Sequence, residues 1–368
     1  MQFSIAKKTL AEMLGLLERI VPNRSASVSL TNLRVEPSER GLTFTGTNLE
    51  LDLEVTLPAQ VVDPLPFMVP GHLLASVVKN LPGDLVEVVL EGSTLTVQCG
   101  GAVFNLSTGD VDTFPFISFP DHYQYVLDAA ALRRSLQAVK YAAAAEDFRA
   151  VFRGVQLELQ AGKSRAIATD GFRLAYRDFE AARPGNAGAF EERKILIPAR
   201  SIDDLTRILR DGDARFSVTQ GNLNVVTDTA RMNVKLMDGV LPDYERVIPA
   251  SAGTTITVDV NALRQALTRV RVVAEKDTQN RVDFILADGI LRLVAEASSG
   301  NARDELEVEQ DHPGGVQIGF KVNQVLDALS PMEGQAVIGF NAVGAPAVFR
   351  DPGDPNYLAI VVSLRLGA

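Results

Sequence analysis

The stretch Ala168-Thr169-Asp170-Gly171-Phe172-Arg173-Leu174 lies near the middle of the 368-residue chain and follows two segments with the pattern of β-strands. Residues 155–159 alternate apolar and polar side chains, as a half-buried strand does. A polar turn over residues 160–164 leads into residues 165–168, which predicts a second strand paired with the first. Weaker copies of this arrangement occur before and after it, which predicts an internal repeat.

A helix is predicted before each copy of the hairpin. In each of these segments, apolar residues recur three or four positions apart and form one face of an amphipathic helix. The three segments are residues 5–20, 129–142 and 261–272. Leu10, Leu132 and Leu263 occupy matching places in them, separated by 122 and 131 residues, a period too long for a solenoid.

Each copy continues in the same way after its hairpin. A short apolar strand leads into a second predicted helix, and Pro70 and Pro198 stand where a helix begins, a position that tolerates a missing N–H. The second helices are predicted over residues 71–81, 199–210 and 321–329. Further strands are predicted over residues 86–90, 94–98, 103–107, 214–219, 223–227, 231–236, 335–340, 346–350 and 357–364. In the third copy, Asp288-Gly289 between alternating runs predicts a hairpin turn.

Two proline-bearing connectors divide the three copies. They cover residues 114–121 and 241–250. We therefore predict three similar α+β domains, each with two helices packed on antiparallel sheets, over residues 1–121, 122–250 and 251–368.

Composition limits the classes of protein to consider. Hydrophobic residues make up 46% and charged residues 22% of the chain, which is typical of a globular protein. No apolar run approaches the roughly 18 residues of a membrane span, and residues 1–10 lack the apolar core of a signal peptide. Cys99 is the only cysteine and the three histidines are far apart in sequence, which gives a zinc site almost no support. We expect a cytoplasmic protein with no membrane association, no metal and no cofactor.

The distribution of charge matters more than its sum. A net charge of −10 argues, taken alone, against binding to nucleic acid, because phosphate contacts need Lys and Arg. The six predicted helices, however, carry 14 Lys and Arg and 5 Asp and Glu residues, a net +9 that leaves −19 on the remainder. Chance enrichment on exposed helix faces is one explanation; we favour a common surface that binds DNA phosphates without reading bases. Charge alone nominates Arg133, Arg134, Arg200, Arg264 and Arg269 for this surface.

No sequence pattern supports a catalytic reaction. Gly162-Lys163-Ser164 resembles the end of a phosphate-binding loop, but Leu157 stands where that motif needs glycine. Asp170 has two interpretations, a catalytic carboxylate or a turn residue beside Gly171, and we favour the turn. The many other carboxylates cannot be told apart from a solvated acidic surface.

Several stretches together resemble one known family. Residues 168–175, with the pattern Ala-Thr-Asp-Gly-x-Arg-Leu-Ala, and residues 238–249, with Asp-Gly-x-x-Pro-Asp-Tyr-x-Arg-Val-x-Pro, are similar to the most recognisable stretches of the bacterial sliding clamp, the β subunit of DNA polymerase III. Gly46-Thr47-Asn48-Leu49-Glu50 and Ser363-Leu364-Arg365-Leu366 resemble two further motifs of that family. The resemblance covers the full length, with three domains in register.

The resemblance implies the DNA clamp fold, an α+β fold in which two chains form a head-to-tail homodimeric ring. Such a ring encircles double-stranded DNA without sequence specificity, slides along it and serves as a processivity factor with no chemistry of its own. Its implied partners are the replicative polymerase α subunit, the clamp loader and other proteins with a clamp-binding motif. Two alternatives remain open at this point: a magnesium-dependent nuclease and a scaffold that does not bind DNA.

The resemblance also implies a hydrophobic pocket for partner peptides between the central and C-terminal domains. The matching residues are Phe152, Thr169, Gly171, Phe172, Arg173, Leu174, Pro242, Arg246, Val247, Pro346, Ile360, Val362, Ser363, Leu364 and Arg365. The family usually has His where Phe172 stands and a methionine-containing tail at Val362-Ser363-Leu364, and methionine adapts its shape more readily than valine or leucine. We therefore expect a stiffer pocket with a shifted peptide preference, and Gly367 and Ala368, past the usual end, near its rim.

The last two sets of residues concern DNA and the second chain. Arg24 and Arg149 match family positions that contact the duplex. The implied dimer seam pairs the strand at residues 104–107 with an edge near residues 302–308 of the other chain. The side chains expected to pack across this seam are Phe104 and Leu106 from one chain and Val272 and Val273 from the other.

Overall fold

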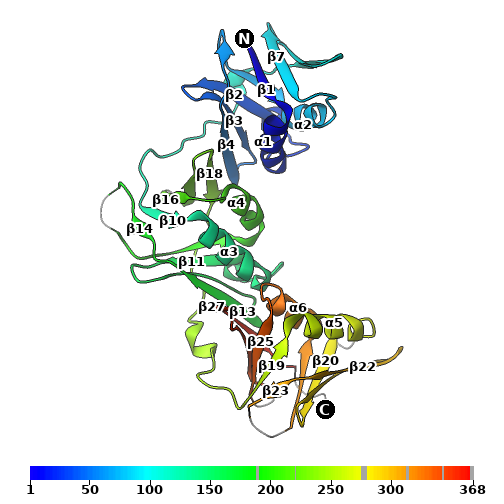
Figure 1. The fold of residues 1–368 in the computed structure, drawn as a ribbon. Coiled ribbons are helices and arrows are strands. Elements are labelled where there is room, and N and C mark those ends of the chain that lie inside the picture. Colours follow the sequence, from blue (N-terminus) through cyan, green and yellow to red (C-terminus); the bar gives the residue numbers. More distant parts are fainter. Residues whose placement is uncertain (188–189, 220, 275–279, 312–314, 342–343, 365–368) are drawn as a thin grey trace. The chain divides into compact units, whose positions relative to one another are not determined.

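A computed structural model describes the chain except for residues 188–189, 220, 275–279, 312–314, 342–343 and 365–368. Its described part contains six α-helices, and the paired strands are antiparallel throughout (Figure 1). The chain forms two compact units, each built from more than one segment of the sequence. The first unit comprises Met1–Ala130, Arg183–Phe190 and Ser201–Leu236, and the second comprises Ala131–Ala182, Glu191–Arg200 and Met237–Ala368.

The first unit contains two sheets. Its helices are α1 (Lys7–Ile20), α2 (Gly71–Lys79) and α4 (Ile202–Ile208). The five-stranded sheet has the order β5 (Val61–Val62), β1 (Gln2–Ala6), β7 (Leu85–Glu91), β8 (Thr94–Cys99), β9 (Ala102–Ser107). The nine-stranded sheet has the order β14 (Arg183–Pro184), β10 (Tyr125–Asp128), β16 (Asp213–Thr219), β17 (Asn222–Val226), β18 (Ala230–Lys235), β4 (Leu51–Leu57), β3 (Gly41–Thr47), β2 (Asn32–Ser38), β6 (Phe67–Pro70). The pairing of β18 with β4 joins segments far apart in sequence.

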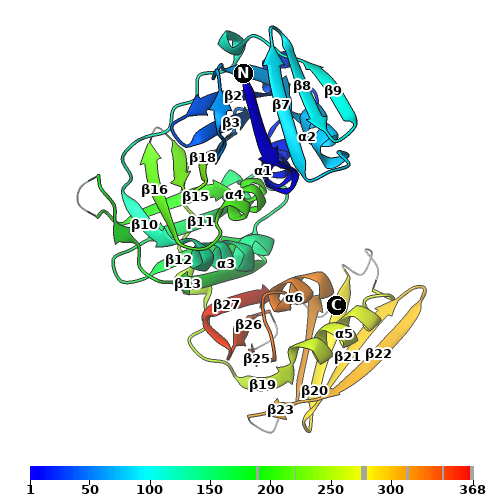
Figure 2. The same cartoon turned by 45° about the horizontal axis from the view of Figure 1, so that its top comes forward.

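The second unit repeats this plan. Its helices are α5 (Val260–Val270), α6 (Val322–Leu329) and most of α3 (Ala129–Val139). Its nine-stranded sheet has the order β15 (Arg193–Pro198), β11 (Gly154–Leu159), β12 (Ser164–Thr169), β13 (Arg173–Phe179), β27 (Asp354–Val362), β26 (Pro346–Asp351), β25 (Gln335–Phe340), β19 (Thr254–Asp259), β23 (Glu309–Gln310). Its four-stranded sheet has the order β22 (Gly300–Glu307), β21 (Ile290–Ala297), β20 (Arg281–Ala287), β24 (Val316–Lys321), and α5 packs against β21 and β22 (Figure 2).

The six predicted helices are all present, with small differences at their ends. The segment 129–142 is an α-helix only to Val139 and finishes as a 3-10 turn over Lys140–Ala142. The segment 199–210 begins with a 3-10 turn over Ala199–Ser201 and is α-helical only over Ile202–Ile208. Such 3-10 turns are common at helix ends because they satisfy terminal backbone groups in a tighter winding.

One strand is buried more fully than its sequence pattern predicted. Residues 155–159 alternate apolar and polar side chains, yet every residue of β11 is buried. The polar side chains Gln156 and Glu158, expected on a solvated face, are 1% and 4% exposed. They lie beneath the connector that follows Met237, because Leu241 and Tyr244 hydrogen-bond to them.

The predicted turn at Asp288-Gly289 is confirmed. Ala287 and Ile290 are paired across β20 and β21, and the two residues between them have φ angles of 51° and 75°. Positive φ at both central positions is the signature of the type I′ turn, whose twist matches that of the flanking strands.

This turn gives a test on glycine. Gly289→Ala is expected to destabilise the protein by about 1 kcal/mol, because a side chain in the left-handed region is strained. Gly15→Ala, inside α1 with open space around the added methyl group, is expected to stabilise it by about 0.5–1 kcal/mol. Urea or thermal unfolding of both variants measures the difference. Shifts of the same sign would contradict the assigned turn.

Candidate functional site

The loop between β12 and β13 is a tight turn built by Asp170. Its Oδ1 accepts hydrogen bonds from the backbone N–H groups of Phe172 and Arg173, at 2.8 and 2.9 Å. Thr169 Oγ1 donates to the carbonyl of Arg173 at 2.7 Å, and Gly171 takes a φ of 87°. These bonds agree with the interpretation of Asp170 as a turn residue. They hold Phe172 at the tip of the loop, where it is 57% exposed.

Arg173 ties this loop to α6. Its Nε donates to Asp170 Oδ2 at 3.0 Å, and its Nη1 donates to Asp327 Oδ2 at 2.5 Å. The guanidinium also lies 5.6 Å from the centre of the Tyr141 ring. Because both carboxylates hold one largely buried guanidinium, the loop is fixed relative to the helix.

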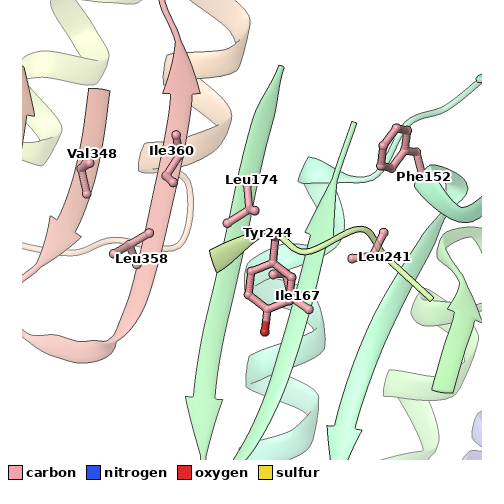
Figure 3. Packing of buried hydrophobic residues seen from close by; sticks show 8 residues of the cluster. All are labelled: Phe152, Ile167, Leu174, Leu241, Tyr244, Val348, Leu358 and Ile360. Carbon is pink, nitrogen blue, oxygen red and sulfur yellow. The ribbon is translucent and has the colours of Figure 1, made fainter. Parts of the chain in front are cut away.

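The strand β27 lies beside β13 and brings further apolar side chains close to this loop. β13 pairs with β27 in a register that sets Leu174 opposite Ile360, and Val362 donates its backbone N–H to the carbonyl of Phe172 at 2.9 Å. Side chains two positions apart on a strand share a face, so Ile360 and Val362 point to the same side of the sheet. Leu174, Ile360 and Tyr244 belong to one buried apolar cluster (Figure 3).

These elements enclose a pocket of about 180 Å³. Apolar side chains dominate its walls, and Arg173, Thr169 and Asp243 supply polar atoms. The lining residues are Phe152, Thr169, Gly171, Phe172, Arg173, Leu174, Pro242, Asp243, Tyr244, Val247, Pro346, Ile360 and Val362. An apolar cavity with a few polar groups at its edge is suited to a hydrophobic side chain of a partner or ligand.

Eleven of the fifteen residues named from the resemblance line this pocket. Arg246 does not line it, and pairs instead with Asp243 at 2.7 Å. Ser363 follows the end of β27 and is buried, and its Oγ donates to the Ala345 carbonyl at 3.1 Å. Leu364 is also outside the lining and is bonded through its backbone N–H to Gly319. Arg365, Gly367 and Ala368 lie outside the described residues.

Two lining residues were not named from the sequence. Asp243 and Tyr244 follow Pro242 directly in the quoted motif at residues 238–249, so the motif itself contained the signal. Tyr244 is the more consequential omission, because its ring lies in the apolar cluster under the pocket while its hydroxyl is hydrogen-bonded in the interior.

Arg149, named for DNA contact, lies beside this pocket. Its guanidinium stands 4.1 Å from the centre of the Phe152 ring and 5.2 Å from that of Phe148. It also pairs with Asp147 at 3.3 Å, and that pairing lowers the pKa of the carboxyl group. Phe148 is 93% exposed. The guanidinium thus contacts two aromatic rings, one of which, Phe152, lines the pocket.

The other arginines named for DNA differ in their surroundings. Arg24 and Arg134 are exposed, and Arg133 is half-buried on α3. Arg200 is exposed at the 3-10 turn before α4. Arg269 pairs with Asp304 at 2.6 Å.

Arg264 contacts the end of α6. Its Nη2 donates to the carbonyl oxygens of Leu329 and Met332, where α6 ends. A cation there satisfies terminal carbonyls and the negative end of the helix dipole. Its visible role is therefore a helix cap within the second unit, which charge counting could not reveal.

The edges predicted for the dimer seam are free edges in the described part of the chain. β9 is the outer strand of the five-stranded sheet, and β22 is the outer strand of the four-stranded sheet. Phe104 and Val272 are exposed, and Val273 is half-buried. Leu106 is 6% exposed and is paired with Leu95 on β8.

The described ranges contain neither a metal-binding cluster nor a membrane span. No group of three or more His, Cys, Asp or Glu side chains is close enough there to hold a metal ion. Within the same residues, no helix is both long enough and apolar enough to cross a membrane.

Known proteins match the chain from end to end. Models of the DNA polymerase III beta subunit match residues 1–118 with its N-terminal domain, 126–243 with its central domain and 245–365 with its C-terminal domain. The beta sliding clamp of Pseudomonas aeruginosa is 30% identical over 335 residues, covering 89% of this chain and 90% of its own. That of Vibrio cholerae is 27% identical over 374 residues, covering all of both chains.

Solved structures of sliding clamps match the fold of this chain over its full length. The Pseudomonas aeruginosa sliding clamp bound to griselimycin has a TM-score of 0.91 and 27% identity, with both chains fully covered. The beta subunit of Thermotoga maritima has a TM-score of 0.88 and 25% identity, again with full coverage. The expected clamp fold is thereby confirmed, and so is the resemblance seen in the motifs. The chain belongs to the DNA polymerase III beta subunit family, the bacterial beta sliding clamps.

Proposed function

We propose that two copies of this chain form a head-to-tail ring that encircles duplex DNA and tethers partner proteins through the pocket beside Phe172. The general role follows from the family: the beta subunit is a processivity factor and a non-catalytic accessory subunit of DNA polymerase III. The observation that carries the proposal is the match to all three domains of that subunit, in order, over residues 1–365. Neither a magnesium-dependent nuclease nor a DNA-free scaffold finds support in this family.

The finer parts of the proposal are the domain boundaries, the location and the partners. We place the three domains at residues 1–121, 122–250 and 251–368 and the protein in the cytoplasm. The partners we propose are the polymerase α subunit, the clamp loader and other proteins that carry a clamp-binding motif. A related clamp binds griselimycin, and we propose that this chain binds it too.

The chemistry of the pocket supports a peptide ligand. Leu174 and Ile360 form an apolar floor, while Phe172 and Val247 stand at the rim, 57% and 54% exposed. A hydrophobic side chain inserted between them would bury apolar surface on all sides, worth about 25 cal/mol per Å². Arg173 is held rigidly by two carboxylates, so it can fix orientation without being ordered on binding.

The pocket rim gives a matched pair of variants. Val247→Asp places a carboxylate against the bound side chain, and its desolvation is expected to weaken peptide binding by tenfold or more. Val240→Asp is the control, since Val240 is 55% exposed on the same connector and does not line the pocket. Fluorescence anisotropy with a labelled hexapeptide ending in Leu-Phe measures both. Equal losses of affinity in the two variants would contradict the proposed pocket.

The seam is proposed between two free sheet edges. β9 and β22 each present unpaired backbone groups, which readily add a strand from another chain. A head-to-tail contact uses two different surfaces, and these are different. Phe104 lies on β9, and Val272 and Val273 follow α5.

Phe104→Asp is expected to yield monomers in sedimentation velocity, because a buried unpaired carboxylate would oppose the contact. Val62→Asp is the control, since Val62 is exposed on β5, at the opposite edge of the same sheet. A dimer that survives Phe104→Asp, or is disrupted equally in Val62→Asp, would rule out β9 as the seam.

The basic helices are proposed to face the duplex. The logarithm of affinity falls as the logarithm of salt concentration rises. Replacing Arg24, Arg133 and Arg134 together with Ala should make this fall less steep, by up to about 0.9 in slope for each phosphate that is no longer neutralised. Arg40→Ala removes an exposed cation in the turn between β2 and β3 and should leave the slope unchanged. Titrations of duplex binding at several salt concentrations provide the measurement. An unchanged slope in the triple variant would remove these residues from the DNA-facing surface.

A further inference from the structure

One wall of the pocket is a connector with little regular structure. It runs from Met237 to residue 250 and contains only one 3-10 turn, Glu245–Val247. Its backbone is joined to the sheet at its start, where Met237 donates to the Leu196 carbonyl at 2.9 Å. Pro242, Tyr244 and Val247 nevertheless line the pocket. Other groups must therefore hold this wall in place.

The first such group is Gln156 on β11. Its Oε1 accepts a hydrogen bond from the backbone N–H of Leu241 at 2.7 Å. Its Nε2 donates to Glu158 Oε1, also at 2.7 Å, which fixes the orientation of the amide. Both side chains are almost fully buried, 1% and 4% exposed. A buried amide serving as both donor and acceptor leaves Leu241 one favourable position.

The second group is the Glu158 carboxylate. Its Oε2 accepts from the Tyr244 hydroxyl at 3.2 Å, and Lys194 on neighbouring β15 lies 3.1 Å from Oε1. Arg165 Nη1 in turn donates to the Tyr244 hydroxyl at 3.2 Å, while Asp178 holds Arg165 at 2.6 Å. The hydroxyl is thus bonded as acceptor on one side and donor on the other.

Tyr244 joins these polar bonds to the pocket. Its ring packs in the apolar cluster with Ile167 and Leu174 (Figure 3), while its hydroxyl reaches the Glu158 carboxylate. Burial raises the pKa of the hydroxyl to about 12, so it stays a neutral donor at pH 7. Any displacement of the ring would break a buried hydrogen bond, which is costly.

We propose that Gln156 and Glu158 are positioning residues of the peptide pocket: through Leu241 and Tyr244 they fix the connector wall, and so set which side chain the pocket accepts. This inference rests on the proposed peptide-binding function and adds two residues that touch no ligand. Two buried polar side chains on an otherwise apolar strand reduce stability unless their polar atoms are hydrogen-bonded. Gln156 and Glu158 find these hydrogen-bond partners in the connector wall, at Leu241 and Tyr244.

The test uses the full chain and two variants. Gln156→Leu removes the acceptor for the Leu241 N–H with little change in volume, and Tyr244→Phe removes only a hydroxyl. Each is expected to raise the Kd for the labelled Leu-Phe hexapeptide by about fivefold or more, the effect of removing one hydrogen bond. The preference for that peptide over one ending in Leu-Ala should shrink as well. Amide exchange should accelerate at residues 239–248 and stay unchanged in β12 and β13.

Thr47→Val is the matched control. It also deletes a buried hydroxyl that donates to a carboxylate, Asp52 Oδ1 at 2.5 Å, but it lies in the first unit. Its Kd and its peptide preference should stay within twofold of the wild type. Equal effects in Thr47→Val and Tyr244→Phe would overturn the inference, because a general loss of stability would then explain the weaker binding.

The outcomes also separate the two proposals. If the wild type binds the hexapeptide and neither Gln156→Leu nor Tyr244→Phe changes its Kd or its preference, the positioning role is wrong and the pocket function stands. If the wild type binds neither the hexapeptide nor griselimycin, the proposed peptide function fails, and this role for Gln156 and Glu158 fails with it.

Discussion

The antiparallel pairing of β13 with β27 is the interaction on which the pocket depends. It joins residues 154–198 and 254–362 into one nine-stranded sheet and sets Leu174 opposite Ile360. A slip of one residue would turn every side chain of β27 to the other face. Buried Arg177 restrains the register, because its Nε donates to Asp354 at 2.6 Å and its Nη1 donates to Ser135 at 2.9 Å.

The connector after Met237 forms the part of the pocket wall that the sheet does not provide. Strand pairing alone would leave the polar face of β11 in water and the pocket open on one side. The connector crosses that face, and Gln156 and Glu158 become buried partners of its backbone and of Tyr244. Fold and site are thus coupled: the polar atoms that would be costly beneath the connector are the same atoms that hold it.

Local features of the fold were predictable from the sequence, and long-range ones were not. Helix periodicity located three helices, and their place after a short apolar strand in each copy located the other three. Asp288-Gly289 specified its turn, and all these patterns depend on neighbouring residues. The pairings of β4 with β18 and of β13 with β27 bring together segments with no shared pattern, so periodicity could not identify them. The burial of Leu106, Gln156 and Glu158 depends on what covers each strand, which the alternation of residues does not contain.

The site was predictable only in part for a similar reason. Most residues named from the resemblance line one pocket, because the motifs of a family mark residues that lie together in its fold. Composition gave no indication of this pocket. Charge counting found basic helices, but it could not foresee that Arg264 caps α6 or that Arg269 pairs with Asp304. An acidic chain can still hold DNA if its cations face the duplex and its carboxylates face away.

Encirclement of the duplex can be measured directly, because a closed ring leaves DNA only over a free end. The protein is placed on nicked circular DNA with a clamp loader and separated from free protein at moderate salt, and the circle is then cut with a restriction enzyme. The protein is expected to remain on the intact circle and to leave the linear DNA within minutes, by sliding off its ends. Equal retention on circular and linear DNA would contradict it, because binding would then depend on contacts and not on encirclement.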